Sequence, residues 1–281
     1  MENYQIIENF GLKSIIKKFS ESGQKDVYLV ESEEYGKVIL KIITRIDERV
    51  KREIQIVTIN NFENVPKIFK SDSFEIAETK GLYIYEQYID GYSLRDLLND
   101  KERLSLKETM DLCETMLSIL LQLEKHKIVH RDIKPENILF DNNTHKWFLI
   151  DFGIARALEL SSLTNTATLM GPHTPGYGAP ELFQYKKTDI DNRSDIFSLG
   201  VVLFECLTGK NPFRSNSDYG LFDIWYKTIT LLPENIQIDG DDGMQFVNLI
   251  QVFMAKPIAQ RPRNVEKAIK WFYEVKQKLG L

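Results

Sequence analysis

The chain has 281 residues, which is enough to bury a sizeable core as one large domain or two small ones. Its 43% hydrophobic and 27% charged residues are typical of a soluble globular protein. The formal net charge of −5 argues against a general nucleic-acid-binding protein, because such proteins are usually basic.

No apolar run approaches the roughly 18 residues that a membrane span needs. The N-terminus MENYQIIENF lacks the basic and apolar regions of a signal peptide. Cys113 and Cys206 lie within helical apolar patterns, so we expect two buried free thiols in a reducing compartment. The sequence therefore predicts a cytoplasmic protein without a membrane span.

The first third of the chain has the pattern of a small sheet. Residues 15–44 alternate in polarity and are rich in β-branched residues, which predicts short antiparallel strands. Residues 45–60 carry apolar side chains at helical spacing, and strand character returns at about 67–89. We expect a β-rich region with one helix.

The remainder is mostly helical. The expected helices cover residues 93–99, 106–127, 193–209, 244–254 and 264–279. A β-rich first third followed by an α-helical remainder predicts an α+β fold with two lobes, joined near residues 87–92.

Three segments carry the most specific information. HRDIKPENILF stands at 130–140, IDFGIAR at 150–156 and APE at 179–181. In this order and at these separations they resemble the catalytic loop, the metal-binding turn and the activation-segment terminus of eukaryotic-type (Hanks-type) Ser/Thr protein kinases. The resemblance extends over nearly the whole chain, and DFGIAR and GQKDVYLV are similar to segments of bacterial eukaryotic-like kinases.

The resemblance implies a single protein kinase domain over residues 1–281 with a bilobal fold. Its small β-rich N-lobe would run to about residue 87, its hinge would cover about 87–91, and its larger α-helical C-lobe would run from about 92 to the end. The implied cosubstrate is ATP with Mg²⁺, or Mn²⁺ as an alternative. The implied partners are protein substrates with Ser/Thr acceptors, and a dimer for trans-autophosphorylation is one option.

The resemblance implies catalytic and metal-binding roles for residues of these motifs. Asp132 would accept or orient the proton of the acceptor hydroxyl, and Lys134 would reach the γ-phosphate, as in the Ser/Thr branch of the family. Asn137 and Asp151 would bind the metal, since Mg²⁺ prefers oxygen ligands. Thr174 matches a threonine near the acceptor pocket, which favours Ser/Thr over Tyr as substrate.

Lys41, in VILK, resembles the third-strand lysine that contacts the α- and β-phosphates. Its expected partner is Glu53 on the following helix, with Glu48 as the alternative. Glu86 falls at the gatekeeper position, and the backbone of the linker from Gln87 to Ile89 would pair with adenine.

The loop that should cover the nucleotide departs from the family pattern GxGxxGxV. Residues 20–27 read SESGQKDV, so that serines and a lysine occupy the three glycine places. Glycines allow the backbone to approach phosphates closely. Backbone groups at Ser22 and Gly23 are still expected to bind the nucleotide, and Val27 would cover the adenine.

Two further matches imply structural roles. Asp195 resembles the helix residue that holds the backbone of the catalytic loop. Glu181 and Arg261 resemble a buried ion pair that anchors the activation segment, and breaking such a pair costs on the order of 3–5 kcal/mol.

The segment before Glu181 is rich in hydroxyl groups, and its plain interpretation is a flexible polar loop. The functional interpretation is autophosphorylation, with Arg131 and Arg156 binding the phosphate. The candidate acceptors are Ser161, Ser162, Thr164, Thr166 and Thr168, of which Thr166 and Thr168 are favoured.

Two other functions fit parts of the pattern. A pseudokinase, which binds or scaffolds without turnover, is supported by the degenerate loop at 20–25. A small-molecule kinase of the aminoglycoside or choline type shares the catalytic Asp and Asn, but usually lacks the HRDIKPEN and APE segments. Comparing phosphate transfer from labelled ATP by the native chain and by Asp132→Asn separates the three functions.

Overall fold

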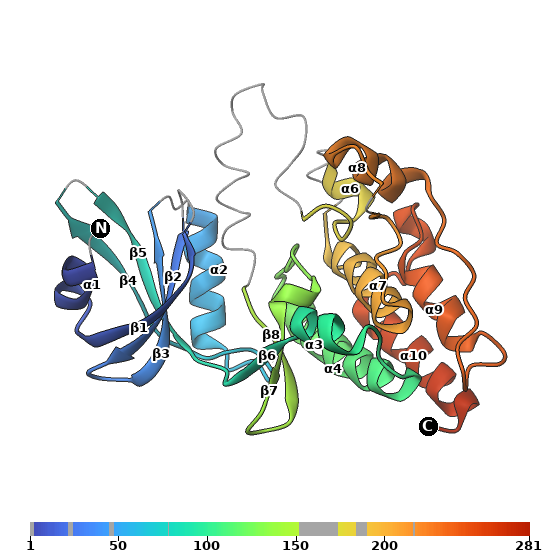
Figure 1. Cartoon of the computed structure of the whole chain (residues 1–281), viewed down its shortest axis with the longest axis horizontal. Helices are drawn as coiled ribbons and strands as arrows, with labels where there is room; N and C mark the ends of the chain where they lie inside the picture. The colour runs from blue at the N-terminus through green and yellow to red at the C-terminus, as the bar shows by residue number, and fades with distance from the viewer. Residues whose placement is uncertain are drawn as a thin grey trace. The chain divides into compact units, whose positions relative to one another are not determined.

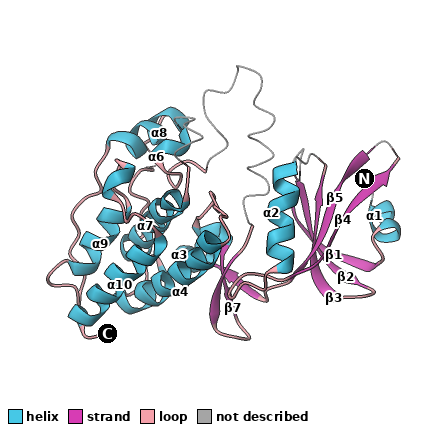
Figure 2. Cartoon of the chain, turned by 180° about the vertical axis from the view of Figure 1, so that it is seen from behind, coloured by secondary structure: helices cyan, strands magenta, loops and turns pink. Residues whose placement is uncertain are grey.

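The computed structural model describes residues 3–21, 25–44, 48–77, 79–151, 174–183, 190–215 and 217–281, without the side chains at 20–21 and 48–53. The described residues form two compact units, of which the first ends at Asp90 and the second begins at Gly91. Strands predominate in the first unit and helices in the second (Figure 2). The α+β class expected from the sequence is confirmed.

A five-stranded antiparallel sheet forms the centre of the first unit, with strand order β1-β2-β3-β5-β4 (Figure 1). The strands span Leu12–Glu21 (β1), Lys25–Ser32 (β2), Gly36–Ile43 (β3), Ile68–Ile76 (β4) and Thr79–Gln87 (β5). The expected strands are therefore confirmed, and the helix expected at 45–60 is α2, Glu48–Ile59.

Each face of this sheet has its own helix. The short α1, Asn3–Asn9, was not expected from the sequence, and it places Ile6 on a cluster that includes Tyr28, Leu40 and Ile42. Because side chains alternate along a strand, Ile39 and Lys41 of β3 project to the opposite face. In Figure 1, α1 and α2 lie on opposite sides of the strands. Since Leu40 and Ile42 pack with Ile6 of α1, the Lys41 side chain is on the face away from α1.

The second unit begins with a small antiparallel sheet and continues as helices. Its strands are β6 (Gly91–Ser93), β7 (Ile138–Asp141) and β8 (Lys146–Leu149). Its α-helices are α3 (Leu94–Lys101), α4 (Leu106–Lys125), α6 (Pro180–Phe183), α7 (Asn192–Thr208), α8 (Leu221–Thr230), α9 (Gln245–Phe253) and α10 (Val265–Leu279). The five helices expected here are confirmed, whereas α6 and α8 were not expected.

Helix α7 is the centre of the second unit. All of its residues except Arg193 and Thr208 are buried, and it packs against α4, α9 and α10. A side chain at Gly200 would come within 2.9 Å of Phe253 and 2.8 Å of Met254, so glycine allows α7 and α9 to approach closely. A helix buried on all sides gives rigid support to whatever is bonded to it.

Local sequence defines where the first helices of this unit begin. Ser105 accepts from the N–H of Glu108, and the Glu108 carboxylate accepts from the N–H and hydroxyl of Ser105, which is a capping box. These bonds and the nearby Lys101 lower the pKa of Glu108 to about 2. Ser93 and Asp96 form a second capping box at α3.

The two cysteines are free and buried, as expected. Burial raises the pKa of both the Cys113 and the Cys206 thiol. Within the described residues, no helix combines the length and the apolar character that crossing a bilayer requires.

Candidate active site

The catalytic loop of the second unit is fixed by one buried carboxylate. Asp195, on α7, accepts hydrogen bonds from the backbone N–H of His130 at 2.7 Å and of Arg131 at 2.8 Å. Arg131 has a φ of 66°, a left-handed conformation that a side chain makes unfavourable. The two charge-assisted bonds offset this strain. Asp195 therefore holds the loop as the sequence analysis predicted.

Asp132 is the centre of a hydrogen-bonded cluster directly after this anchor. Its Oδ2 lies 3.0 Å from the Lys134 ammonium and accepts from the Asn137 amide at 3.0 Å. Its Oδ1 accepts from the Thr174 hydroxyl at 3.0 Å, and Lys134 donates to the same hydroxyl oxygen at 3.0 Å. The structure thus brings together four residues that the sequence analysis associated with phosphoryl transfer.

The orientation of Asn137 bears on metal binding. Its amide nitrogen donates to the backbone oxygen and the carboxylate of Asp132, so its carbonyl oxygen is the end that remains for another partner. The Ile150 N–H donates to the backbone carbonyl of Asn137 at 2.9 Å, which fixes the chain just before Asp151.

Asp151 itself has a φ of 62°. An amide oxygen and a carboxylate form the kind of oxygen donor set that Mg²⁺ prefers. In the described part of the chain no group of three His, Cys, Asp or Glu residues could hold a metal by itself. The residues present fit an ion that completes its coordination with phosphate and water.

The sheet of the first unit carries a buried ion pair. The Lys41 ammonium lies 2.7 Å from both carboxylate oxygens of Glu86. The side chain of Glu53, the partner expected from the sequence, lies outside the described part of the structure, as does that of Glu48. The analysis of the sequence placed Glu86 at the gatekeeper position but missed its bond to Lys41.

The nucleotide-binding predictions in this unit are only partly within the described residues. Ser22 and Gly23 lie outside them. Val27 pairs with Lys41 across β2 and β3, so both side chains lie on the same face of the sheet. The Gln87 N–H already donates to the Lys67 carbonyl at 2.8 Å, and Ile89 is buried.

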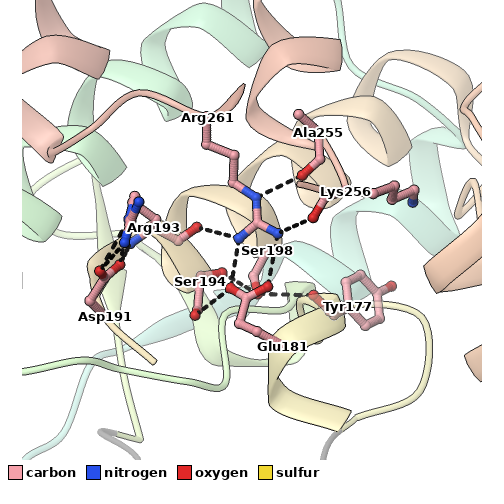
Figure 3. A network of polar contacts seen from close by, with 9 residues as sticks. All are labelled: Tyr177, Glu181, Asp191, Arg193, Ser194, Ser198, Ala255, Lys256 and Arg261. Carbon is pink, nitrogen blue, oxygen red and sulfur yellow. Dashed lines mark hydrogen bonds and ion pairs between the residues drawn. The ribbon is translucent and has the colours of Figure 1, made fainter. Parts of the chain in front are cut away.

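The predicted ion pair between Glu181 and Arg261 is confirmed (Figure 3). Two parallel bonds, of 2.7 and 2.9 Å, join the guanidinium to the carboxylate, and the Ser194 hydroxyl donates to Glu181 at 2.7 Å. The remaining guanidinium bonds go to the backbone carbonyls of Ala255, Arg193 and Lys256. This network joins α6 to α7 and to the turn before α10.

A second network beside the catalytic loop was not expected. Arg95 of α3 bonds to Glu136 and Glu205, each at 2.9 Å, and also donates to the Tyr177 hydroxyl. Burial and the neighbouring Glu205 raise the pKa of Tyr177, so its hydroxyl stays protonated and donates to Glu205. The network connects the PEN segment after Lys134 to α3 and α7.

Comparison with known proteins agrees with this geometry. The family model described as "Protein kinase domain" matches residues 25–272. The probable serine/threonine-protein kinase PknB of Lactococcus lactis subsp. lactis is 30% identical over 263 residues, which cover 90% of this chain and 40% of the relative.

Two further relatives give the same result. Serine/threonine-protein kinase PrkC of Bacillus subtilis is 32% identical over 216 residues, covering 74% of this chain and 32% of the relative. Serine/threonine-protein kinase PknB of Mycolicibacterium smegmatis is 36% identical over 172 residues, covering 60% of this chain and 27% of the relative. The chain thus spans at most 40% of the length of these curated relatives. Because the family model covers most of the residues and the Asp132 cluster has the arrangement its motifs predict, this chain belongs to the protein kinase domain family.

Proposed function

We propose that the chain is an active Ser/Thr protein kinase that transfers the γ-phosphate of ATP to hydroxyl groups of proteins. The observation that carries the proposal is the bond from the Thr174 hydroxyl to Asp132, with the Lys134 ammonium on the same oxygen. A carboxylate that accepts a hydrogen bond from a threonine hydroxyl can accept one from a substrate hydroxyl. The printed names of the relatives, which are Ser/Thr protein kinases, support the same reaction.

The expected step is an in-line displacement. Asp132 orients the acceptor hydroxyl and takes its proton while the hydroxyl oxygen bonds to the γ-phosphorus and the bond to the ADP oxygen breaks. Lys134 supplies positive charge beside Asp132, where it stabilises the γ-phosphate oxygens in transfer. Lys41 would bind the α- and β-phosphates.

Protein kinase domains use ATP and typically a divalent metal. Asn137 and Asp151 are the residues that would hold Mg²⁺, with Mn²⁺ as the alternative ion. The ion would neutralise phosphate charge and align the phosphates. The two bonds from the Asn137 amide nitrogen to Asp132 hold this amide with its oxygen available to such an ion.

The pseudokinase and the small-molecule kinase remain alternatives with less support. Lys41, Asp132, Asn137 and Asp151 are all present, which the first alternative does not require. Autophosphorylation at 161–168 stays a prediction, because these residues lie outside the described part of the chain. Dimerisation and the cytoplasmic location likewise stay predictions.

The direct test is transfer from γ-labelled ATP and Mg²⁺ to basic and acidic model proteins. We expect Asp132→Asn to reduce kcat by about 10²–10⁴-fold, the range that a positioned general base contributes. Asp151→Asn should also abolish transfer while leaving the fold intact. The matched control is Asp100→Asn, since Asp100 is an exposed aspartate on α3, and its activity should equal that of the native chain.

Three outcomes would contradict the proposal. Native-like turnover by Asp132→Asn would exclude the mechanism. A native chain that binds ATP but transfers no phosphate to protein, to itself or to small alcohols would be a pseudokinase. Phosphoamino acid analysis of the product should give phosphoserine and phosphothreonine, and phosphotyrosine alone would contradict the assigned acceptor class.

A further inference from the structure

The Lys41–Glu86 pair follows from the register of two strands. Lys41 of β3 lies opposite Ile84 of β5, and Glu86 lies opposite Ile39. Lys41 and Glu86 are therefore diagonal neighbours on one face of the sheet, a separation that long side chains can bridge. Both carboxylate oxygens lie 2.7 Å from the ammonium, so both accept a hydrogen bond from Lys41.

The environment makes this bond strong. The side chains of Lys41 and Glu86 are 4% and 8% exposed, so water screens their attraction little. The same sheet carries another cross-strand pair for comparison, between Lys80 and Glu75 at 2.8 Å. There the side chains are 70% and 62% exposed, and a pair of that kind contributes little.

A buried lysine paired in this way has to bind a further anion when it binds a nucleotide. Phosphate oxygens and the Glu86 carboxylate are both negative, and both accept hydrogen bonds from the Lys41 ammonium, which has three N–H donors. In a poorly screened environment two anions at one ammonium repel each other. A nucleotide phosphate therefore binds Lys41 only by weakening the bond to Glu86 or by accepting repulsion from it.

We propose that Glu86 is an affinity- and specificity-determining residue that competes with nucleotide phosphates for Lys41. The inference rests on the proposed function, because it concerns the nucleotide that the kinase would use. Glu86 lowers affinity for adenine nucleotides through their phosphates and leaves the recognition of the adenosine part unchanged. The differences in affinity among adenosine, AMP, ADP and ATP are consequently smaller than they would be if Lys41 had no carboxylate at Glu86 beside it.

The test is the affinity of the full chain for adenosine, ADP and ATP, measured by calorimetric titration with and without Mg²⁺. Glu86→Gln keeps the size of the side chain and removes its charge. We expect it to bind ADP and ATP about tenfold more tightly than the native chain, which corresponds to ~1.4 kcal/mol. Its affinity for adenosine should change by less than about twofold, since adenosine offers no phosphate.

Glu75→Gln is the matched control. It removes the same charge from the same sheet, at an exposed pair, and it should leave all three affinities at the native values. Thermal unfolding of each variant verifies the fold. Should Glu86→Gln not fold, Glu86→Asp withdraws the carboxylate by one methylene and should strengthen ADP binding in the same direction by a smaller factor.

The outcomes separate this inference from the proposed function. A folded Glu86→Gln, or Glu86→Asp in its place, that binds ADP no more tightly than the native chain overturns the competition. An equal gain for adenosine and ADP also overturns it, because Glu86 would then act on the base. If neither the native chain nor any variant binds a nucleotide, the proposed function fails and the inference fails with it.

Discussion

Among its described residues, each unit of this protein contains a buried ion pair of short distance, Lys41–Glu86 in the first and Arg261–Glu181 in the second, and the two look alike at first. The Lys41 and Glu86 side chains of the first unit are 4% and 8% exposed, and those of Arg261 and Glu181 in the second unit are 0% and 8% exposed. The shortest distance is 2.7 Å in both. Distance and burial therefore do not distinguish them.

The type of cation and the network around the pair of the second unit distinguish the two pairs. The Arg261 guanidinium bonds to three backbone carbonyls besides Glu181, and Ser194 donates to the same carboxylate. The planar fork of an arginine suits such a fixed network, whereas a lysine ammonium is a point charge on a flexible stem. The difference indicates a permanent structural role for the pair in the second unit and an exchangeable role for the pair in the first.

The largest effect is expected from breaking the pair of the second unit. Arg261→Met leaves the Glu181 carboxylate buried and uncompensated, which costs on the order of 3–5 kcal/mol of unfolding free energy. Urea unfolding measures the change. Arg263→Met, at an exposed arginine two residues later, is the control and should stay within about 0.5 kcal/mol of the native chain. A loss that small in Arg261→Met would show that the network is not structural.

A second cation, Lys256, lies beside this network, and it should make the stability of the second unit depend on pH. Lys256 lies over the rings of Phe213 and Phe197, at 3.6 and 5.2 Å from the ring centroids. The rings favour the ammonium, but burial and the nearby Arg261 oppose it and lower the pKa of Lys256 to about 7. Since the ordinary pKa is 10.5, the unfolded chain binds more protons between these values, and stability rises with pH.

Lys256→Met should remove this rise, which is at most about 1.4 kcal/mol per pH unit. Unfolding free energies of the native chain and the variant at pH 7 and pH 9 measure it. The variant should gain most over the native chain at the lower pH. Lys270→Met, at an exposed lysine of α10, should keep the native slope, and an equal slope in Lys256→Met would contradict the lowered pKa.

The smallest effect is expected from replacing the whole pair of the first unit. Lys41→Met with Glu86→Met removes both charges of the pair together, and such replacements are often neutral, so we expect a change of at most about 1 kcal/mol. Replacing Glu181 and Arg261 in the same way should instead destabilise, because the carbonyls of Ala255, Arg193 and Lys256 lose their donor. Unfolding of the two double variants compares the units directly, and equal losses would erase the distinction.

The class of fold and the residues of the catalytic loop could be predicted from the amino-acid sequence. Asp132, Lys134 and Asn137 are close along the chain, so a local motif specifies both their identities and their contacts. The strands of the first unit and most of the helices were also predictable, because their periodic patterns extend over many residues. The short helices α1 and α6 were missed, since few residues give no clear period, and the ten-residue α8 was missed as well.

Contacts between side chains that are far apart in the sequence could be seen only in the tertiary structure. The bond between Lys41 and Glu86 joins residues 45 positions apart and depends on the register of β3 against β5. The bond between Arg95 and Glu205 spans 110 positions, and the burial of Lys256 depends on rings from elsewhere in the chain. Spacing along the chain fixes local geometry, whereas strand register and side-chain packing are properties of the whole fold, and they alone bring a second charge next to Lys41.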